Sequence, residues 1–464
     1  MPYQDFRQFL DVLRQQGELI DVDRPIALTD VGKALKQAYQ KGRPAVSFND
    51  NGTEFPLVCG VYSDRNKALL AFQADEKTIL QKVLDGLDNP IAPKMVKGNA
   101  PCHEVVITGD DIDINAFPIP TYSPKDGGPY ITPGIVVSKD PETGVPDIGH
   151  YRFLILGKDT FSFSAQPNHR FGKNLAKCLQ MGARPKAALV IGVDPILAYA
   201  CQVQVSDTTN DWHIAGGIRG EPVELVRCKT IDVEVPATAE VVVEFEIDLK
   251  KLVSEGPLGE YTGYYTPAVN APVATITAIT HRRKPIFKAL LTGKPITENH
   301  ILKQIPFESS FFNTLKRQFP TVENVSVRAS AGVSFYVVIA MRPRFAGEAR
   351  QAILAAMSSN IRPKWVIVVD PDIDVHSSTE VEWAMAFRVL PHRDVIVANG
   401  LPSGPADPAT ITLTPDGERI SAALALSSSV GVDATLPVGE AFSEVADVPG
   451  WRDYPMPELG RGEA

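Results

Sequence analysis

The sequence predicts a multidomain α/β protein, on three observations. Helical and strand-like patterns are mixed over residues 1–103, runs rich in β-branched residues dominate residues 104–300, and short apolar strands alternate with helices over residues 320–464. A chain of 464 residues also agrees with about three domains, at roughly 150 residues each. We therefore expect a small N-terminal α/β unit, a central β domain and a C-terminal α/β domain, with a linker helix over residues 301–319.

The N-terminal unit is predicted from helical patterns and the short runs between them. Residues 26–42 and 76–87 have the apolar spacing of helices, and an amphipathic helix precedes them at the start of the chain. The runs AVSF and PLVCGVY between these helices predict strands. A Pro- and Gly-rich passage over residues 116–134 then favours non-helical backbone.

The central domain is predicted as a sheet or barrel that carries one helix. Residues 170–182 have the pattern of that helix, which a glycine closes. Strand-like runs enriched in β-branched residues surround it: GIVVSKD, YRFLILGKD, AALVIGVDP, EVVVEFEID, VATITAIT and PIFKALLTG.

The C-terminal domain is predicted from alternating strands and helices, which are typical of βαβ units. The run WVIVVD is apolar on both faces, as a central parallel strand should be. Neither G-x-G-x-x-G nor G-x-x-x-x-G-K-[ST] occurs in the chain, so no nucleotide-binding fingerprint accompanies this alternation.

Composition excludes several classes of function. The net charge of -9 and the lack of a dense basic cluster argue against a nucleic-acid partner. No apolar run reaches the roughly 18 residues of a membrane span. The N-terminal helix contains acidic residues and has no continuous apolar core, so we do not expect it to be a signal peptide. The five cysteines are odd in number and form no C-x-x-C, which indicates reduced thiols in a cytoplasmic protein.

The stretch SEGPLGEYTGYY carries the first candidate site. Glu255 and Glu260 lie on either side of a Gly-Pro-Leu-Gly turn, and three tyrosines follow. An arbitrary pair of glutamates is most often solvated on a loop. Here the turn fixes their separation, and the aromatic residues could desolvate them, so that one carboxyl keeps its proton and acts as a general acid.

Three further segments contain candidate ligands. Asp147 lies in DIGHYRFLI, His169 precedes the predicted central helix, and Asp211 and His213 precede what we expect to be a glycine-rich strand. Each residue is, by itself, more often an ordinary polar, capping or core residue than a ligand. Together, Asp147, His169 and Asp211 would form an oxygen-rich site with one imidazole, which suits Mn²⁺ or Mg²⁺.

A series of motifs resembles the UbiD family of reversible decarboxylases, which use prenylated flavin mononucleotide (FMN). They occur in order along nearly the whole chain: DGGPYIT, DIGHYR, NHR, AGGIRGEPVELV, VPATAE, EGPLGEYTGYY and KWVIVVDPDIDV. The resemblance implies that the central domain is a split β-barrel like that of flavin reductases and that the C-terminal domain mediates dimerisation, as a homodimer or a homohexamer.

The resemblance implies a catalytic trio of Arg152, Glu255 and Glu260. Arg152 would bind the substrate carboxylate, and Glu255 would pair with it at the flavin edge. Glu260 would donate the proton that replaces the lost carboxylate. The implied reaction is the reversible, non-oxidative decarboxylation of an aromatic, heteroaromatic or α,β-unsaturated acid, through a covalent adduct with prenylated FMN and with release of CO₂.

Cofactor and metal residues are implied in the same way. The family's metal ligands are Asn, His and Glu, and the matching residues here are Asp147, His169 and Asp211, so two of the three depart from the pattern. The ion would be Mn²⁺ or Mg²⁺, with K⁺ as a further cation, and a flavin prenyltransferase would supply the cofactor. The remaining implied residues are Asn168, His169, Arg170 and Lys364 at the cofactor and His300 in the substrate pocket.

Two other functions compete with the decarboxylase. The central domain could bind plain FMN, as a split-barrel reductase or a flavin-binding protein without decarboxylase activity. Alternatively, the chain could store or deliver cofactor for another subunit. The intact trio argues against both, whereas the two unusual metal positions favour them.

Overall fold

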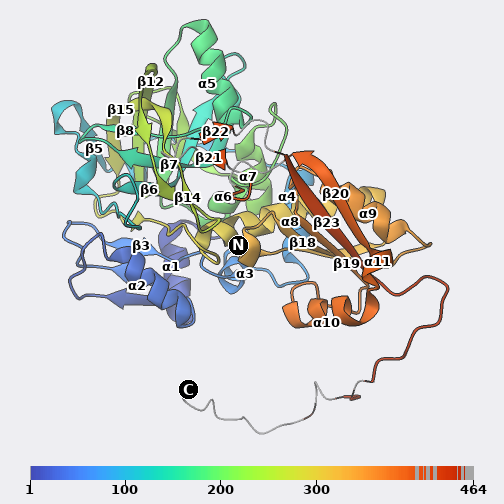
Figure 1. The fold of residues 1–464 in the computed structure, drawn as a ribbon. Helices are drawn as coiled ribbons and strands as arrows, with labels where there is room; N and C mark the ends of the chain where they lie inside the picture. The colour runs from blue at the N-terminus through green and yellow to red at the C-terminus, as the bar shows by residue number, and fades with distance from the viewer. Residues whose placement is uncertain are drawn as a thin grey trace.

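The computed structural model consists of an N-terminal α/β region, a central barrel and a C-terminal sheet region (Figure 1). This architecture confirms the predicted multidomain α/β fold. The structure describes residues 2–402, 407–410, 412–413, 419–421, 426–446, 448–450 and 454.

The N-terminal region is a small sheet covered by helices. Its strand order is β1-β2-β3-β16, and β16 (Phe287–Lys288) comes from the end of the central region, which ties the two together. One face of α1 is fully buried through Phe6, Phe9, Leu10 and Leu13, as the amphipathic pattern predicts. The elements are α1 (Phe6–Gln15), β1 (Leu19–Val22), α2 (Val31–Gln40), β2 (Ala45–Phe48), β3 (Leu57–Cys59), α3 (Arg65–Phe72), α4 (Ile79–Asp88) and β4 (Lys94–Met95).

The central region is a closed barrel. Of the two predicted arrangements, a sheet or a barrel, the structure therefore has the barrel. Its strands pair in the order β12-β9-β6-β7-β8-β15, and pairing of β12 with β15 closes the ring, while β5 extends β15. A cluster of phenylalanines, among them Phe153, Phe161 and Phe245, fills the interior. The strands are β5 (Val105–Thr108), β6 (Tyr130–Lys139), β7 (Pro146–Ile155), β8 (Thr160–Ser162), β9 (Lys186–Ile191), β10 (Glu224–Arg227), β11 (Glu234–Pro236), β12 (Val241–Glu255), β13 (Leu258–Gly259), β14 (Tyr265–Thr266) and β15 (Val269–His281).

The barrel region carries more helices than the single one predicted. Besides α5 (Arg170–Met181), it contains α6 (Pro195–Ala200) and α7 (Asp211–Arg219). The predicted glycine-rich strand after Asp211 is therefore wrong, because that segment forms α7. A Cβ on Gly217 would lie 2.2 Å from the carbonyl oxygen of Gly86, so these glycines let α7 pack backbone to backbone against α4. That packing overrides their low helix propensity.

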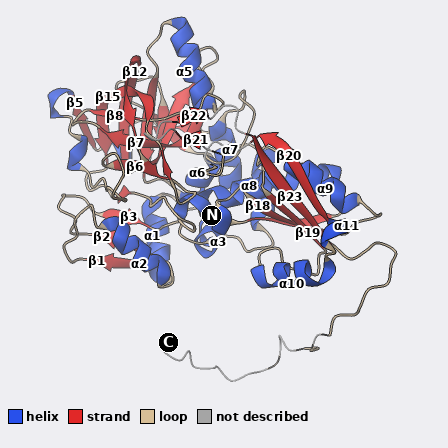
Figure 2. Cartoon of the chain, in the orientation of Figure 1, coloured by secondary structure: helices blue, strands red, loops and turns tan. Residues whose placement is uncertain are grey.

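The C-terminal region is a five-stranded sheet between helices, with the order β17-β18-β19-β23-β20 (Figure 2). The central strands β18, β19 and β23 are parallel, which confirms the predicted βαβ character. Alternate side chains of the sheet pack on α9 and α10, which cover its two faces. The elements are α8 (Glu298–Gln318), β17 (Val322–Val327), β18 (Tyr336–Met341), α9 (Glu348–Met357), β19 (Trp365–Val369), α10 (Ser378–Arg388), α11 (Pro391–Asp394), β20 (Val395–Pro402), β21 (Thr412–Leu413), β22 (Arg419–Ser421) and β23 (Leu426–Ala434).

The long helix α8 joins the barrel to the C-terminal sheet, where the linker helix was predicted, and it starts three residues earlier, at Glu298. The predicted domain boundaries themselves stay predictions. Among the described residues, no helix combines the length and the apolar composition that crossing a membrane requires.

Candidate active site

Arg152 lies between the two glutamates of the predicted trio. Its Nε and Nη2 donate to Glu255 Oε1 and Oε2, each at 3.1 Å, which is a bidentate ion pair. Its Nη1 donates to Glu260 Oε1 on the other side. Strand β7 supplies the arginine, Glu255 ends β12, and Glu260 directly follows β13. The structure thus brings together the three residues that the sequence selects.

The turn between β12 and β13 sets the separation of the two acids. Glu255 is the last residue of β12, and Gly256 follows with φ of +108°. A Cβ at Gly256 would lie 3.1 Å from the Cα of Ala268, so only glycine fits both the backbone conformation and the space. The hairpin of β13 and β14 then holds Glu260, whose N–H donates to the carbonyl of Tyr264 at 2.9 Å.

Residues just before β6 and at its first position support this turn, and no role is predicted for them from the sequence. Tyr130 donates its hydroxyl hydrogen bond to Glu255 Oε1 at 2.9 Å. Asp126 Oδ1 accepts from the N–H of Gly259 at 3.0 Å, and the N–H of Gly127 donates to the carbonyl of Pro257 at 2.9 Å. The available signal was the motif DGGPYIT, which contains all three supporting residues.

The two glutamates differ in accessibility. The side chain of Glu255 is fully buried, whereas that of Glu260 is 17% accessible. Burial alone would lower the pKa of the Arg152 guanidinium, but the two carboxylates together raise it, so the arginine stays charged. Of the three tyrosines expected to desolvate the pair, only Tyr261 is partly buried, because Tyr264 and Tyr265 are exposed.

A second arginine joins two of the predicted metal ligands. Arg170 Nη1 lies 2.6 Å from Asp211 Oδ1, and its Nε lies 3.6 Å from Asp147 Oδ1. Arg170 Nη2 also donates to the carbonyls of Pro146 and Thr209, at 3.1 and 2.9 Å. Burial raises the pKa of Asp147 to about 6, and it raises that of Asp211 as well, while Arg170 opposes both shifts.

In this arrangement the residues do not fit a divalent cation. The guanidinium of Arg170 occupies the position between the two carboxylates, and His169 is exposed just before α5. No group of three His, Cys, Asp or Glu side chains among the described residues could hold a metal ion. The assignment of Asp147, His169 and Asp211 to Mn²⁺ or Mg²⁺ therefore stays a prediction, as does that of K⁺, and it requires Arg170 to leave the aspartates.

The groups around His150 fit a flavin better than the cluster around Arg170 fits a metal ion. Gln202 Nε2 donates to His150 Nδ1 at 2.6 Å. Burial first, and then the charges of Lys288 and Lys303, lower the pKa of His150 to about 3, so the imidazole is neutral. A neutral imidazole, an amide and nearby ammonium groups form a donor set that fits a polar ring bearing a phosphate. Gln202 and the two lysines belong to no motif that could have indicated them.

His300 has a structural role at the start of α8. The N–H of Thr297 donates to His300 Nδ1 at 2.9 Å in a capping box, and His300 Nε2 donates to the carbonyl of Tyr261 at 2.6 Å. Both ring nitrogens are thus used by the protein, and burial lowers the pKa of the imidazole to about 4. A direct contact of His300 with substrate stays a prediction.

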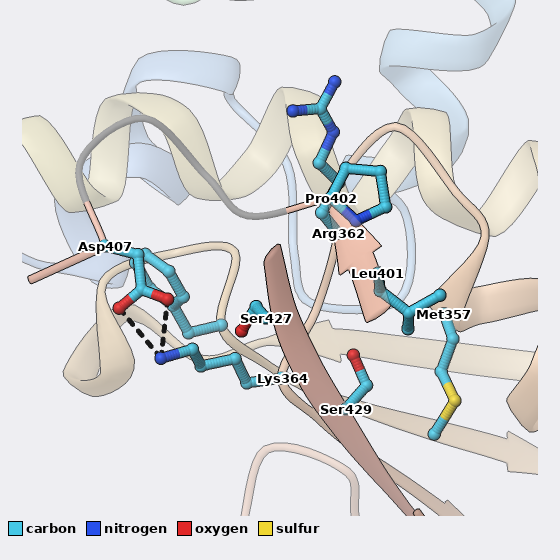
Figure 3. Close-up of a pocket in the computed structure, with 9 residues that line it drawn as sticks. Met357, Arg362, Lys364, Leu401, Pro402, Asp407, Ser427 and Ser429 are labelled. Carbon is cyan, nitrogen blue, oxygen red and sulfur yellow. Dashed lines mark hydrogen bonds and ion pairs between the residues drawn. The ribbon is translucent and has the colours of Figure 1, made fainter. Parts of the chain in front are cut away.

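Lys364 lies in the C-terminal region, one residue before β19, where it pairs with Asp407 at 2.6 Å (Figure 3). The space beside it has a volume of only 10 Å³, enough for about one water molecule, so no phosphate fits there in this arrangement. Asn168 is exposed beside His169 at the start of α5. The cofactor contacts predicted for Asn168, His169, Arg170 and Lys364 stay predictions.

Comparison with known proteins identifies the family. Three family models match consecutively: the N-terminal, Rift-related and C-terminal domains of 3-octaprenyl-4-hydroxybenzoate carboxy-lyase, UbiD, over residues 10–87, 94–295 and 300–434. An uncharacterised protein of Archaeoglobus fulgidus is 30% identical over 432 residues, which cover 88% of each chain.

Solved structures agree with this match. The UbiD-class enzyme HmfF from Pelotomaculum thermopropionicum, in complex with FMN, superposes with a TM-score of 0.89 at 32% identity, over 97% of this chain and 98% of that one. Vanillic acid decarboxylase from Sedimentibacter hydroxybenzoicus, in its open form, gives a TM-score of 0.87 at 28% identity over 98% of both chains. The chain therefore belongs to the UbiD family of decarboxylases that depend on prenylated FMN.

Proposed function

We propose that this chain catalyses the reversible, non-oxidative decarboxylation of an aromatic, heteroaromatic or α,β-unsaturated carboxylic acid with prenylated FMN. The observation that carries the proposal is the position of Arg152 between two glutamates of unequal accessibility. Hydride transfer by a plain flavin reductase needs no such trio. Loss of CO₂ from an sp² carbon does need a carboxylate-binding cation and a proton donor.

The electron pair that CO₂ leaves behind needs an acceptor, and prenylated FMN supplies one when it is bound. The chain has to hold the acid and deliver a proton. Arg152 is the cation for the substrate carboxylate, because its Nη1 contact with Glu260 can be exchanged while its bidentate pair with Glu255 stays in place. Tyr130 and the barrel strands fix Glu255 in that pair.

Glu260 is the proton donor in this proposal. Its carboxyl group is partly accessible, so it can take up a proton from solvent, which the fully buried Glu255 cannot do as readily. Glu260 also lies on a short hairpin instead of a barrel strand, and among the described residues its Oε2 has only the N–H of Tyr261 as a partner, at 3.3 Å. A proton held there can be passed to the carbon that has lost CO₂.

The cofactor is proposed to lie against His150 and Gln202, with its phosphate near the start of α5. Arg170 is the first residue of that helix, and the N-terminus of a helix favours phosphate. Asn168, His169 and Lys364 are the further proposed contacts, and a flavin prenyltransferase would supply the cofactor. The proposal also includes a cytoplasmic homodimer, supported by the five free cysteines and by the dimeric form described for an evolved HmfF.

One observation favours a second candidate, an FMN-binding protein without decarboxylase activity. Arg170 occupies the position between Asp147 and Asp211, where the family resemblance implies a metal. If the cofactor binds only as plain FMN, the trio would be intact but unused.

The test is to express the chain with a flavin prenyltransferase, identify the bound flavin by mass and absorption spectra, and assay CO₂ release over a panel of aromatic acids. We expect bound prenylated FMN, turnover of at least one acid, and loss of that turnover in Glu260→Gln with the cofactor retained. Glu142→Gln, at an exposed glutamate, is the matched control. Plain FMN without turnover would support the second candidate, and full activity of Glu260→Gln would exclude Glu260 as the donor.

A further inference from the structure

Lys303 is a charged side chain of α8 with which no described residue pairs. The buried polar side chains of this helix all hydrogen-bond within the protein: Glu298, His300, Gln304, Glu308 and Ser309. Lys303 is half-buried in the same helix, and within the described part of the chain its ammonium group makes no hydrogen bond or ion pair. Enclosing an ammonium without an anion is unfavourable, so such a group points to an anionic ligand.

The ammonium group of Lys303 lies at the catalytic end of the barrel. Its Nζ is 4.2 Å from the ring centroid of Tyr261, the residue that directly follows Glu260. Its charge, after burial, contributes to lowering the pKa of His150, His169 and His300. Burial lowers the pKa of Lys303 itself, and the carboxylate of Glu260 opposes that shift. Lys303 is therefore within electrostatic range of both the proton donor and the predicted flavin site.

We propose that Lys303 binds a second anionic group of the substrate, on the side of the pocket away from the carboxylate held by Arg152. The substrate class is then an aromatic acid with two anionic groups, such as a dicarboxylate. This inference rests on the proposed decarboxylase function and specifies its substrate. A monocarboxylate would leave the ammonium unpaired, whereas a second carboxylate gives it a charge-assisted hydrogen bond.

The phosphate of the cofactor is an alternative ligand for the ammonium group of Lys303. Two features favour the substrate over the phosphate. Lys303 stacks on Tyr261, beside the residue that would protonate the substrate carbon. The phosphate, by contrast, has its own cation in Arg170 at the start of α5. The substrate anion and the cofactor phosphate would bind the ammonium group in the same way, so the experiment has to distinguish between them.

The experiment measures ligand binding to the full chain loaded with plain FMN, so that it does not depend on turnover. Benzoate is compared with benzene-1,3-dicarboxylate and benzene-1,4-dicarboxylate by calorimetric or fluorescence titration. We expect the wild type to bind at least one dicarboxylate more tightly than benzoate. In Lys303→Met that preference should fall about tenfold or more, while the affinities for benzoate and FMN change little. Lys303→Arg should keep most of the preference for the dicarboxylate over benzoate.

Lys173→Met is the matched control, because Lys173 also acts on the pKa of His169 but is paired with Asp207 at the surface. Equal preference in the wild type and Lys303→Met would overturn the proposal, as would a wild type without any preference. A tenfold loss of FMN affinity in Lys303→Met would also overturn it and assign the lysine to the phosphate. Failure of the decarboxylase function would show separately, as bound dicarboxylate without CO₂ release from the prenylated enzyme.

Discussion

Arg152 and Arg170 each lie between two carboxylates, and strand β7 contributes to both clusters, yet the two are built differently. Around Arg170, both acids are buried, and two backbone carbonyls accept hydrogen bonds from its Nη2. Around Arg152, the two acids flank one turn, and one of them is partly accessible in the loop that joins β13 to β14. The comparison indicates that buried groups hold Arg170 from several sides, whereas Arg152 has one partly accessible, exchangeable partner.

This difference distinguishes an ion-pair cluster that stabilises the fold from one that can take part in a reaction. A guanidinium held by two buried carboxylates and two backbone carbonyls contributes mainly to stability. A guanidinium with one fixed and one exchangeable acid can accept a substrate carboxylate and keep its charge balanced meanwhile. We therefore expect substitutions at Arg152 to affect turnover most and substitutions at Arg170 to affect stability most.

The largest expected effect is that of Arg152→Met. It removes the proposed carboxylate-binding group and leaves Glu255 buried without its cation, so we expect loss of detectable turnover and destabilisation by about 3–5 kcal/mol. CO₂ release and urea unfolding measure the two effects. Arg184→Met, at an exposed arginine on the barrel surface, should change neither. Turnover that survives in Arg152→Met would remove the basis for the comparison.

Arg170→Met is expected to destabilise the protein by about 3–5 kcal/mol, because two buried carboxylates then face each other without a cation. Asp147→Asn in the same chain should restore much of that loss, since it removes one of the two negative charges. Unfolding of the two single variants and the double variant measures the coupling. Additive effects would show that Arg170 and Asp147 do not act as a unit.

The Arg170→Met variant also tests whether Asp147 and Asp211 can bind a metal ion. With Arg170 removed, Asp147 and Asp211 are free to act as ligands, and added Mn²⁺ should then raise the unfolding temperature of Arg170→Met more than that of the wild type. An equal and large rise in the wild type would mean that the metal displaces Arg170 in solution, as the original prediction of a metal site requires.

Tyr130→Phe should have a smaller effect, of about 1.5–3 kcal/mol, because it removes one hydrogen bond to the buried carboxylate of Glu255. Turnover should fall only as far as Glu255 loses its fixed orientation. Urea unfolding and CO₂ release are measured beside Tyr264→Phe, at an exposed tyrosine of the same hairpin. Wild-type stability in Tyr130→Phe would show that Arg152 alone holds Glu255.

The strand patterns predicted the C-terminal alternation but left a sheet or a barrel open for the central region, and the family motifs implied the barrel and selected the three residues of the trio. It did not show that Arg170 bridges Asp147 and Asp211, because spacing along the chain says nothing about where a long side chain extends. The predicted linker helix begins at residue 301 and leaves out His300, whereas His300 is the third residue of α8 and part of its capping box. Lys303 belongs to no motif, and it becomes notable only because none of the residues that the structure describes pairs with it.

The smallest expected effect concerns His150, which stands on β7 between the two clusters. Its pKa is about 3 in the folded protein, against about 6.5 when unfolded, so the unfolded chain binds more protons between these values. The stability that neutral His150 contributes is therefore present above pH 6.5 and is lost as the pH falls toward 3.

Between pH 7.5 and 5.5, we expect the wild type to lose about 1 kcal/mol more stability than His150→Gln, measured by urea unfolding. His300, with a pKa of about 4, remains in both proteins and cancels in the difference, as does any opposing effect of Asp147. His392→Gln, at an exposed histidine, should follow the wild type. Identical pH profiles for the wild type and His150→Gln would mean that the imidazole takes up a proton without cost. The surroundings of His150 would then be open to water instead of closed around a neutral donor set for the flavin ring.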